Sequence, residues 1–144
     1  MRVVISDPKT GKSYQKEIPA EQDVSLVGKK IGEKIDGGLF GAAGYTLEFT
    51  GGSDKSGFPM RRDVVGARKG KILLTKGVGF KTKGSKKKKK GEGKKILKIP
   101  KGQRRRKMVH GNTFSAEIMQ VNCKVTTWGA SPLDQLFPKT EKKS

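Results

Sequence analysis

The sequence predicts a mostly β fold: a small, glycine-rich β-barrel of about six strands, with one or two short helical segments and a long basic hairpin loop. Two observations predict this fold class. Apolar and polar residues alternate over several short segments, which is the two-residue period of a half-buried strand. The chain also has 20 glycines among 144 residues, which suits the tight turns and bulges of a small barrel better than a helical bundle.

The expected strands follow from this alternation and from the turn residues between them. Segments 1–6 and 13–19 flank the turn-rich "DPKTGKS" and predict an N-terminal β-hairpin. The segments "KILLTKG" and "KKILKIPKG" are expected to pair with each other. The parity of the apolar residues changes between Ile118 and Met119, which predicts a bulge or short bend. Strands are thus also expected within 44–52, 70–77, 94–102 and 113–128.

The segment 25–38, "SLVGKKIGEKIDGG", is ambiguous. Val27, Ile31 and Ile35 recur every four residues, as on one face of a helix. Gly28 and Gly32 interrupt that face, and each costs about 1 kcal/mol relative to alanine in a helix. A short helical turn followed by an irregular strand is therefore favoured over one continuous helix.

We expect one β-barrel domain over residues 1–128, with a disordered basic loop at about 81–95. Lys86–Lys90 form an uninterrupted run between glycine-containing segments, and like charges keep such a run extended. The alternative is a solvated loop that serves only solubility. Residues 129–144 contain two prolines and a charged end, so they are expected to be a peripheral or flexible tail.

The positive charge is concentrated in the middle of the chain. The formal net charge is +20. Residues 51–107 carry 22 Lys and Arg but 3 Asp and Glu, whereas residues 1–50 carry 7 of each kind. An ordinary surface mixes both signs, so this segregation indicates a binding footprint for a polyanion, and nucleic acid is the first candidate.

Several other classes of function find little support. His110 and Cys123 are the only histidine and cysteine, which argues against a zinc site, a disulfide scaffold and a catalytic pair. His110 is expected to be a surface donor and Cys123 a small core residue, in a reduced cytosolic setting. No apolar run approaches the roughly 20 residues that span a membrane, and the N-terminus lacks a secretory signal. We expect no cofactor, metal or small-molecule substrate.

The basic residues of the middle segment are the candidate nucleic-acid ligands, and they fall into two kinds. Arginines beside strand or turn signals are expected to be well positioned for phosphates, because the planar guanidinium makes two parallel bonds. Lysines of the run are flexible point charges that bind less specifically. The alternative for any one arginine is a solvated strand edge. The candidates are Lys55, Arg61, Arg62, Arg68, Lys76, Lys81, Lys83, Lys86, Lys87, Lys88, Lys89, Lys90, Arg104, Arg105, Arg106 and Lys107.

The arginine triplet is expected to divide between two faces. Successive side chains of a strand point to opposite faces, and Val109 has the parity of Arg105. If the interior is apolar, Arg105 shares the inner face with Val109, and Arg104 and Arg106 point outward.

Three stretches carry a family resemblance: "GGSDKSGFPM", "KILLTKG" and "GQRRRKMVHGNTFSAEIMQVNCKV". Together they resemble the archaeal and eukaryotic small-subunit ribosomal protein numbered six. The resemblance covers residues 1–128 and is strong from Gly51 onward. Two departures stand out. His110 occupies a position where the family leads us to expect arginine, and residues 129–144 stand in place of the long basic helix of eukaryotic members, which favours an archaeal member.

The resemblance implies a structural constituent of the small ribosomal subunit that supports assembly and translation. The implied partners are small-subunit rRNA and neighbouring ribosomal proteins, at the ribosome in the cytoplasm, with no membrane and no catalysis. The alternative is a free nucleic-acid-binding or RNA-chaperone protein without a fixed ribosomal place. A third option is an enzyme that holds a nucleic-acid substrate with basic residues.

Overall fold

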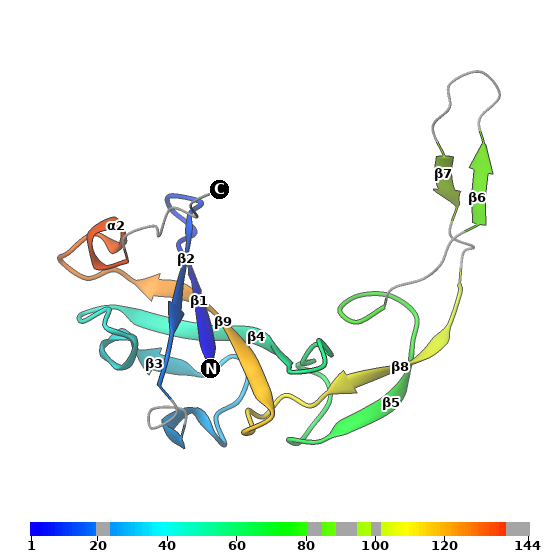
Figure 1. Ribbon diagram of the computed structural model, residues 1–144, viewed down its shortest axis with the longest axis horizontal. Helices are drawn as coiled ribbons and strands as arrows, with labels where there is room; N and C mark the ends of the chain where they lie inside the picture. The colour runs from blue at the N-terminus through cyan, green and yellow to red at the C-terminus, as the bar shows by residue number, and fades with distance from the viewer. Residues whose placement is uncertain (20–23, 81–84, 89–94, 99–101, 138–144) are drawn as a thin grey trace.

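The computed structural model describes residues 1–19, 24–80, 85–88, 95–98 and 102–137 (Figure 1). These ranges contain nine strands, two 3₁₀ helices and one short α-helix, so the mostly β prediction is confirmed. None of these helices is long and apolar enough to cross a membrane. In chain order the elements are β1 (Arg2–Ser6), β2 (Ser13–Glu17), η1 (Val24–Leu26), β3 (Lys34–Asp36), η2 (Gly37–Phe40), β4 (Thr46–Asp54), β5 (Lys69–Leu74), β6 (Ser85–Lys88), β7 (Lys95–Lys98), β8 (Arg105–His110), β9 (Ile118–Thr127) and α2 (Leu133–Leu136).

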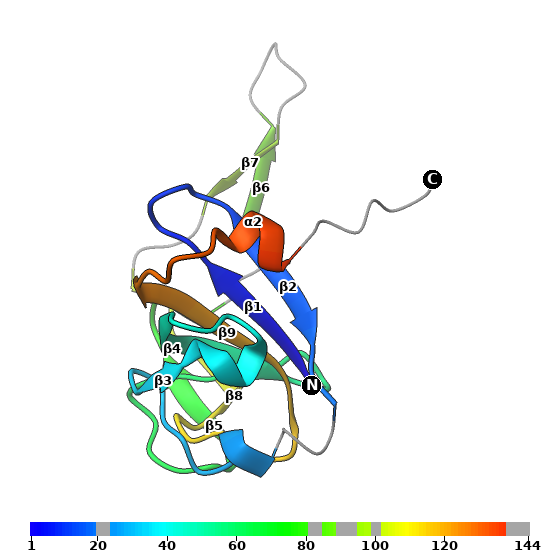
Figure 2. The same ribbon diagram turned by 90° about the vertical axis from the view of Figure 1, so that its left-hand side faces the viewer.

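A five-stranded sheet in the order β2-β1-β9-β4-β3 forms the body of the domain (Figure 2). The predicted β1–β2 hairpin is its first pair, and β1 also runs parallel to β9 with Val3 opposite Val121. β4 and β9 are antiparallel. Within the described residues no pairing joins the outer strands β2 and β3. The predicted closed barrel is therefore not confirmed, and the sheet is open.

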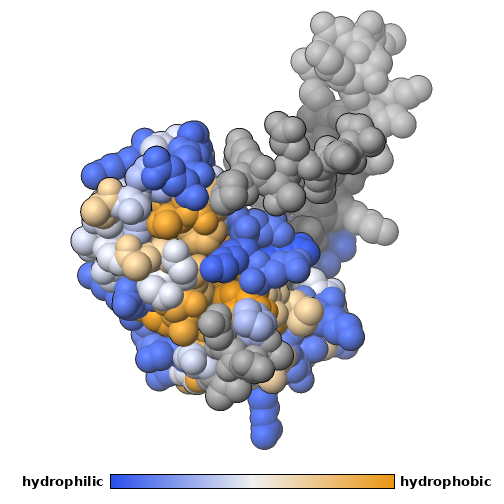
Figure 3. Space-filling model, turned by 60° about the vertical axis from the view of Figure 1, so that its left-hand side comes forward, coloured by the Kyte–Doolittle hydropathy of each residue, from blue (hydrophilic) through white to orange (hydrophobic). Residues whose placement is uncertain are grey.

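The core lies against this sheet and is built mainly from alternate residues of β1, β4 and β9. The rings of Phe49 and Phe114 pack with centroids 4.9 Å apart. Cys123 is 1% exposed, as expected for a core residue, and burial raises the pKa of its thiol to about 12. Where the left-hand side of Figure 1 comes forward, apolar side chains show between hydrophilic ones (Figure 3). The largest fully buried residues include Phe40, Phe49, Phe114, Ile5, Leu26, Leu47 and Ile118.

The predicted irregularity in the last strand is confirmed as a bulge at Met119. Ser53 of β4 pairs with Gln120, and the next residue, Asp54, pairs with Ile118. Met119 is thereby left without a partner and is 48% exposed. The extra residue allows Ile118 and the later apolar residues of β9 to face the same core.

The segment 25–38 is not one helix, as the glycines indicated. It contains η1 at its start, then turns, and then β3. Gly28 and Gly32 have φ angles of 89° and 96°. Those values lie in the left-handed region, which a right-handed helix cannot pass through.

The predicted pairing of "KILLTKG" with "KKILKIPKG" is wrong. β5 pairs with β8, with Lys69 opposite His110 and Leu74 opposite Arg105. β7 pairs instead with β6, and this hairpin stands apart from the five-stranded sheet (Figure 1). The long basic excursion thus lies between β5 and β8 and holds a hairpin of its own. The other residues of 81–95 lie outside the described ranges, so the expected disorder stays a prediction.

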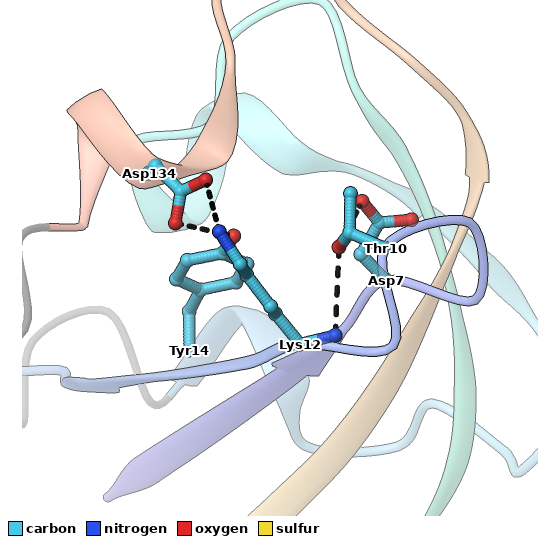
Figure 4. Close-up of polar contacts among 5 residues, drawn as sticks. All are labelled: Asp7, Thr10, Lys12, Tyr14 and Asp134. Atoms are coloured by element: carbon cyan, nitrogen blue, oxygen red, sulfur yellow. Dashed lines mark hydrogen bonds and ion pairs between the residues drawn. The ribbon is translucent and has the colours of Figure 1, made fainter.

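The segment after Trp128 packs on the domain up to residue 137. Leu133 and Phe137 are buried in the core, although the sequence suggested a peripheral or flexible tail from residue 129. Figure 4 shows how α2 is held, because the side chains beside β2 converge on Asp134. Lys12 Nζ lies 2.8 Å from its Oδ2, and the Tyr14 hydroxyl donates to its Oδ1 at 2.9 Å. Residues 138–144 lie outside the described ranges.

Candidate nucleic-acid interface

The two-stranded β5–β8 sheet is attached to the five-stranded sheet through its His110 end. His110 N–H donates to the Pro59 carbonyl at 2.9 Å, and Arg61 N–H donates to the His110 carbonyl at 3.0 Å. Gly111 N–H donates to the Arg68 carbonyl at 3.1 Å. These backbone bonds place the loop between β4 and β5 against the end of β8. The basic residues of that loop are therefore positioned by the fold.

The turn after β4 is also held in place, by the side chain of Asp54. The Asp54 carboxylate accepts from Phe58 N–H at 2.8 Å and lies 3.1 Å from Lys69 Nζ. Its side chain is 0% exposed. Burial acts to raise the pKa of Asp54, but the Phe58 and Lys69 contacts outweigh it, and the pKa lies below its ordinary value. The carboxylate thus ties the end of β4 to the start of β5.

His110 is buried, so its predicted role as a surface donor is wrong. The residue is 0% exposed, and neither ring nitrogen has a hydrogen-bond partner among the described residues. Nε2 lies 3.9 Å from the Glu117 carboxylate, which also lies 3.1 Å from Lys69 Nζ. The basic neighbours suggested exposure, whereas the His110 backbone is paired with the loop after β4 through the bonds to Pro59 and Arg61.

Arg61 is held by the protein itself. Its guanidinium forms two parallel bonds to the Asp63 carboxylate, at 2.8 and 2.5 Å, and donates to the Val78 carbonyl at 2.8 Å. The side chain is 15% exposed. Three of its nitrogens are therefore engaged within the domain, and the bond to Asp63 raises the pKa of Arg61. A simple phosphate contact by Arg61 stays a prediction that this geometry does not favour.

The other described Lys and Arg residues of the β5–β8 sheet and the loops beside it have no acidic partner within ion-pair distance among the described residues. All are exposed except Lys107, which is half-buried. Lys71 was missed by the sequence reasoning, although it lies at an exposed position of the alternating β5. We call this group the unpaired cations: Lys55, Arg62, Arg68, Lys71, Lys76, Arg104, Arg105, Arg106 and Lys107.

The other predicted site residues fall in the basic excursion. Lys86, Lys87 and Lys88 belong to β6. Lys81, Lys83, Lys89 and Lys90 lie outside the described ranges.

Arg105 and Arg106 lie on opposite faces of β8, as predicted, whereas Arg104 precedes the strand and its outward face stays a prediction. Arg105 lies opposite Leu74, which is 4% exposed, and Arg106 lies opposite Leu73, which is 58% exposed. With the Gln103 amide turned so that its oxygen faces Arg105, that oxygen accepts from Arg105 Nε and Nη2 at 3.2 and 3.1 Å. Arg106 therefore points away from the buried face, and the contact with Gln103 restrains the Arg105 side chain.

The five-stranded sheet and the segments next to it carry charges of both signs, and many of them are paired. Arg2 lies 3.2 Å from Glu17, Lys12 lies 2.8 Å from Asp134, and Lys124 lies 3.1 Å from Glu48. By contrast, Asp54 and Asp63 are the only acids described between residues 51 and 110, and Lys69 and Arg61 already neutralise them. The excess positive charge therefore gathers on the β5–β8 sheet and its loops, where it would attract a polyanion.

Comparison with known proteins places the chain in one family. The family model described as Ribosomal protein S6e matches residues 1–99 and 97–138. The chain is similar to the small ribosomal subunit protein eS6 of Methanoculleus marisnigri, with 41% identity over 97% of this chain and 94% of the relative. It is also similar to the eS6 proteins of Methanocaldococcus jannaschii, at 44% identity over 94% of this chain and 89% of the relative, and of Methanococcus maripaludis, at 45% over 92% and 91%. The expected archaeal relationship is thus confirmed, and the chain belongs to the ribosomal protein S6e family.

Proposed function

We propose that this chain is a structural, non-catalytic constituent of the small ribosomal subunit, and that it binds rRNA through the unpaired cations and the basic excursion between β5 and β8. Its partners are rRNA and neighbouring ribosomal proteins, and its place is the ribosome in the cytoplasm. The names of its relatives support the ribosomal role. The observation that carries the rRNA interface is the gathering of the unpaired cations on one sheet and its loops.

The physical basis is electrostatic. Each Lys or Arg that neutralises a phosphate releases condensed counterions, which supplies affinity without reading sequence. A guanidinium adds direction, because its planar fork holds a phosphate through two bonds. Arg104 and Arg106 stand on or beside β8, whose backbone is paired, so they lose less freedom on binding than a lysine on an open chain.

Co-sedimentation tests this function. Tagged protein expressed in cells should remain with small subunits after a high-salt wash. Chemical footprinting should show the same protected rRNA nucleotides in every preparation. Complete release by the wash, with no reproducible footprint, would contradict the proposal and favour a free nucleic-acid-binding or chaperone protein.

A further inference from the structure

A pocket of about 340 Å³ lies where the loop after β4 meets the loop after β5. Its apolar part comes from Ile31, Met60 and Val78. Its charged part comes from Arg61, Arg62 and Asp63. Both arginines are in the segment that we propose to bind rRNA. An apolar recess beside cations fits a ligand with a flat apolar part and an anionic part.

Arg61 offers this pocket a fixed plane. The Asp63 carboxylate and the Val78 carbonyl take bonds from Nε, Nη1 and Nη2, all at the edge of the guanidinium. A guanidinium bonded along its edge keeps its orientation, and the part of the Arg61 side chain that stays accessible, 15%, lines the pocket. Bases that leave an RNA helix stack on aromatic rings or on such guanidinium planes. The ion pair with Asp63 also offsets the charge of Arg61, so Arg61 is better suited to stacking on a base than to binding a phosphate.

Val78 is presented to the pocket by its loop. The side chain is 60% exposed. Gly77 and Gly79 on either side have φ angles of 100° and 82°, which set the turn around it. The Arg61 bond to the Val78 carbonyl holds the same turn. The loop therefore fixes an apolar side chain next to the Arg61 plane.

Arg62 supplies the charge that the pocket leaves unneutralised. The residue is exposed and has no acidic partner among the described residues. Its guanidinium rests over Gly32, because a Cβ built there would lie 2.9 Å from Arg62 Nη2. Because Gly32 has no side chain, there is room for the Arg62 guanidinium at the rim of the pocket. There it can bind an anion next to the apolar recess.

We propose that this pocket takes one unpaired nucleotide of the rRNA, with the base between the Arg61 plane and Val78 and with its phosphate on Arg62. The inference rests on the proposed function and makes it more specific. The nucleotide must be unpaired, because a base inside a duplex cannot reach a recess of this kind without being flipped out. Bulges and loops are also where proteins read RNA most specifically.

A matched pair of variants tests the pocket. Val78→Glu places a charge in the recess, and Val65→Glu adds the same charge at a side chain that is 88% exposed and does not line the pocket. Both should unfold like the unchanged protein in a thermal melt. Stacking of one base accounts for roughly 5- to 150-fold in affinity. Val78→Glu should therefore weaken binding to small-subunit rRNA by at least about fivefold more than Val65→Glu.

Ultraviolet cross-linking with mass spectrometry supplies the second measurement. In the unchanged protein bound to rRNA, one nucleotide without a base-pairing partner should link to the peptide that holds Arg61 or to the one that holds Val78. Val78→Glu should lose this link, and Val65→Glu should keep it. Equal affinities of the two variants with an intact footprint would refute the nucleotide pocket but not rRNA binding. Cross-links to paired nucleotides or to a neighbouring protein would have the same meaning. Absence of any reproducible rRNA footprint in the unchanged protein would overturn the proposed function itself.

Discussion

Replacing Asp54 with asparagine should loosen the junction between the two sheets. The carboxylate is 0% exposed and joins the end of β4 to Lys69 of β5. Asparagine preserves the size of the side chain and can still accept from Phe58 N–H. It loses the charge that attracts the Lys69 ammonium, 3.1 Å away. The change therefore isolates the ionic contribution of this contact.

The expected loss is about 1.5–3 kcal/mol in the free energy of unfolding at pH 7, the range for a hydrogen bond to a charged group. Breaking a fully buried ion pair can cost about 3–5 kcal/mol, because one charge remains buried and alone. That larger cost is not expected here. Lys69 is 33% exposed and keeps Glu117 at 3.1 Å.

The loss should also depend on pH in a defined direction. The pKa of Asp54 is lower in the folded protein than its ordinary value, so the ionised form stabilises the fold. This contribution is fully present above the unfolded pKa of about 3.9, and it is lost as the pH falls through the lower folded pKa. The difference between the unchanged protein and Asp54→Asn should thus be full at pH 7 and should shrink below about pH 4.

Urea unfolding followed by the fluorescence of the single tryptophan measures this difference. Glu33→Gln is the matched control, because Glu33 has no side-chain partner among the described residues, and it should change stability by less than about 0.5 kcal/mol. If Asp54→Asn is as stable as the control at pH 7, the proposed tie between β4 and β5 is refuted. A gap that stays constant down to pH 3 would refute the ionic explanation.

Three further predictions concern the basic residues and the core. Affinity for rRNA should fall by about 10³–10⁵ between 50 and 200 mM salt if roughly 6–10 phosphates are neutralised, and a nearly flat salt titration would contradict this. Replacing Arg104 and Arg106 together with alanine should weaken specific rRNA binding by several kcal/mol, at roughly 1.5–3 kcal/mol per contact. Changing Lys86–Lys90 to serine should mainly reduce non-specific binding. Footprints of both variants on rRNA test this ranking, which is wrong if only the lysine variant loses the specific footprint. Cys123, with a pKa of about 12, should react with a thiol reagent at pH 8 only after unfolding, and rapid labelling of the folded protein would show that it is accessible.

The features that sequence reasoning predicted well are local ones. The β1–β2 hairpin, the bulge beside Ile118 and the break at Gly28 and Gly32 each follow from neighbouring residues, because alternation and glycine conformation act over a few positions. The opposite faces of Arg105 and Arg106 followed from strand parity in the same way.

The partner of β5 could not be predicted in this way. Both "KKILKIPKG" and the segment of β8 contain residues that suit a strand, and nothing local distinguishes them. The choice is made by distant contacts, since the bonds of His110 with Pro59 and Arg61 hold β8 beside the loop that leads into β5. The burial of His110 was likewise not indicated by any local pattern.

The site was predicted as a region more accurately than as individual residues. Most of the predicted cations that the structure describes lack an acidic partner, but Arg61 is bonded to Asp63. An acidic residue two positions away was the available signal for that pair. Lys71 could have been found from its place in the alternation of β5.

A density map of the assembled small subunit containing this protein is the most direct test of the proposed interface. The account predicts rRNA phosphates within hydrogen-bonding distance of Arg104 and Arg106, and rRNA along the loops on either side of β5. It also predicts fewer phosphate contacts at β2 and α2, where Lys12 is already paired with Asp134. A map in which Arg104 and Arg106 face solvent, while β2 and α2 lie on the rRNA, would contradict the account.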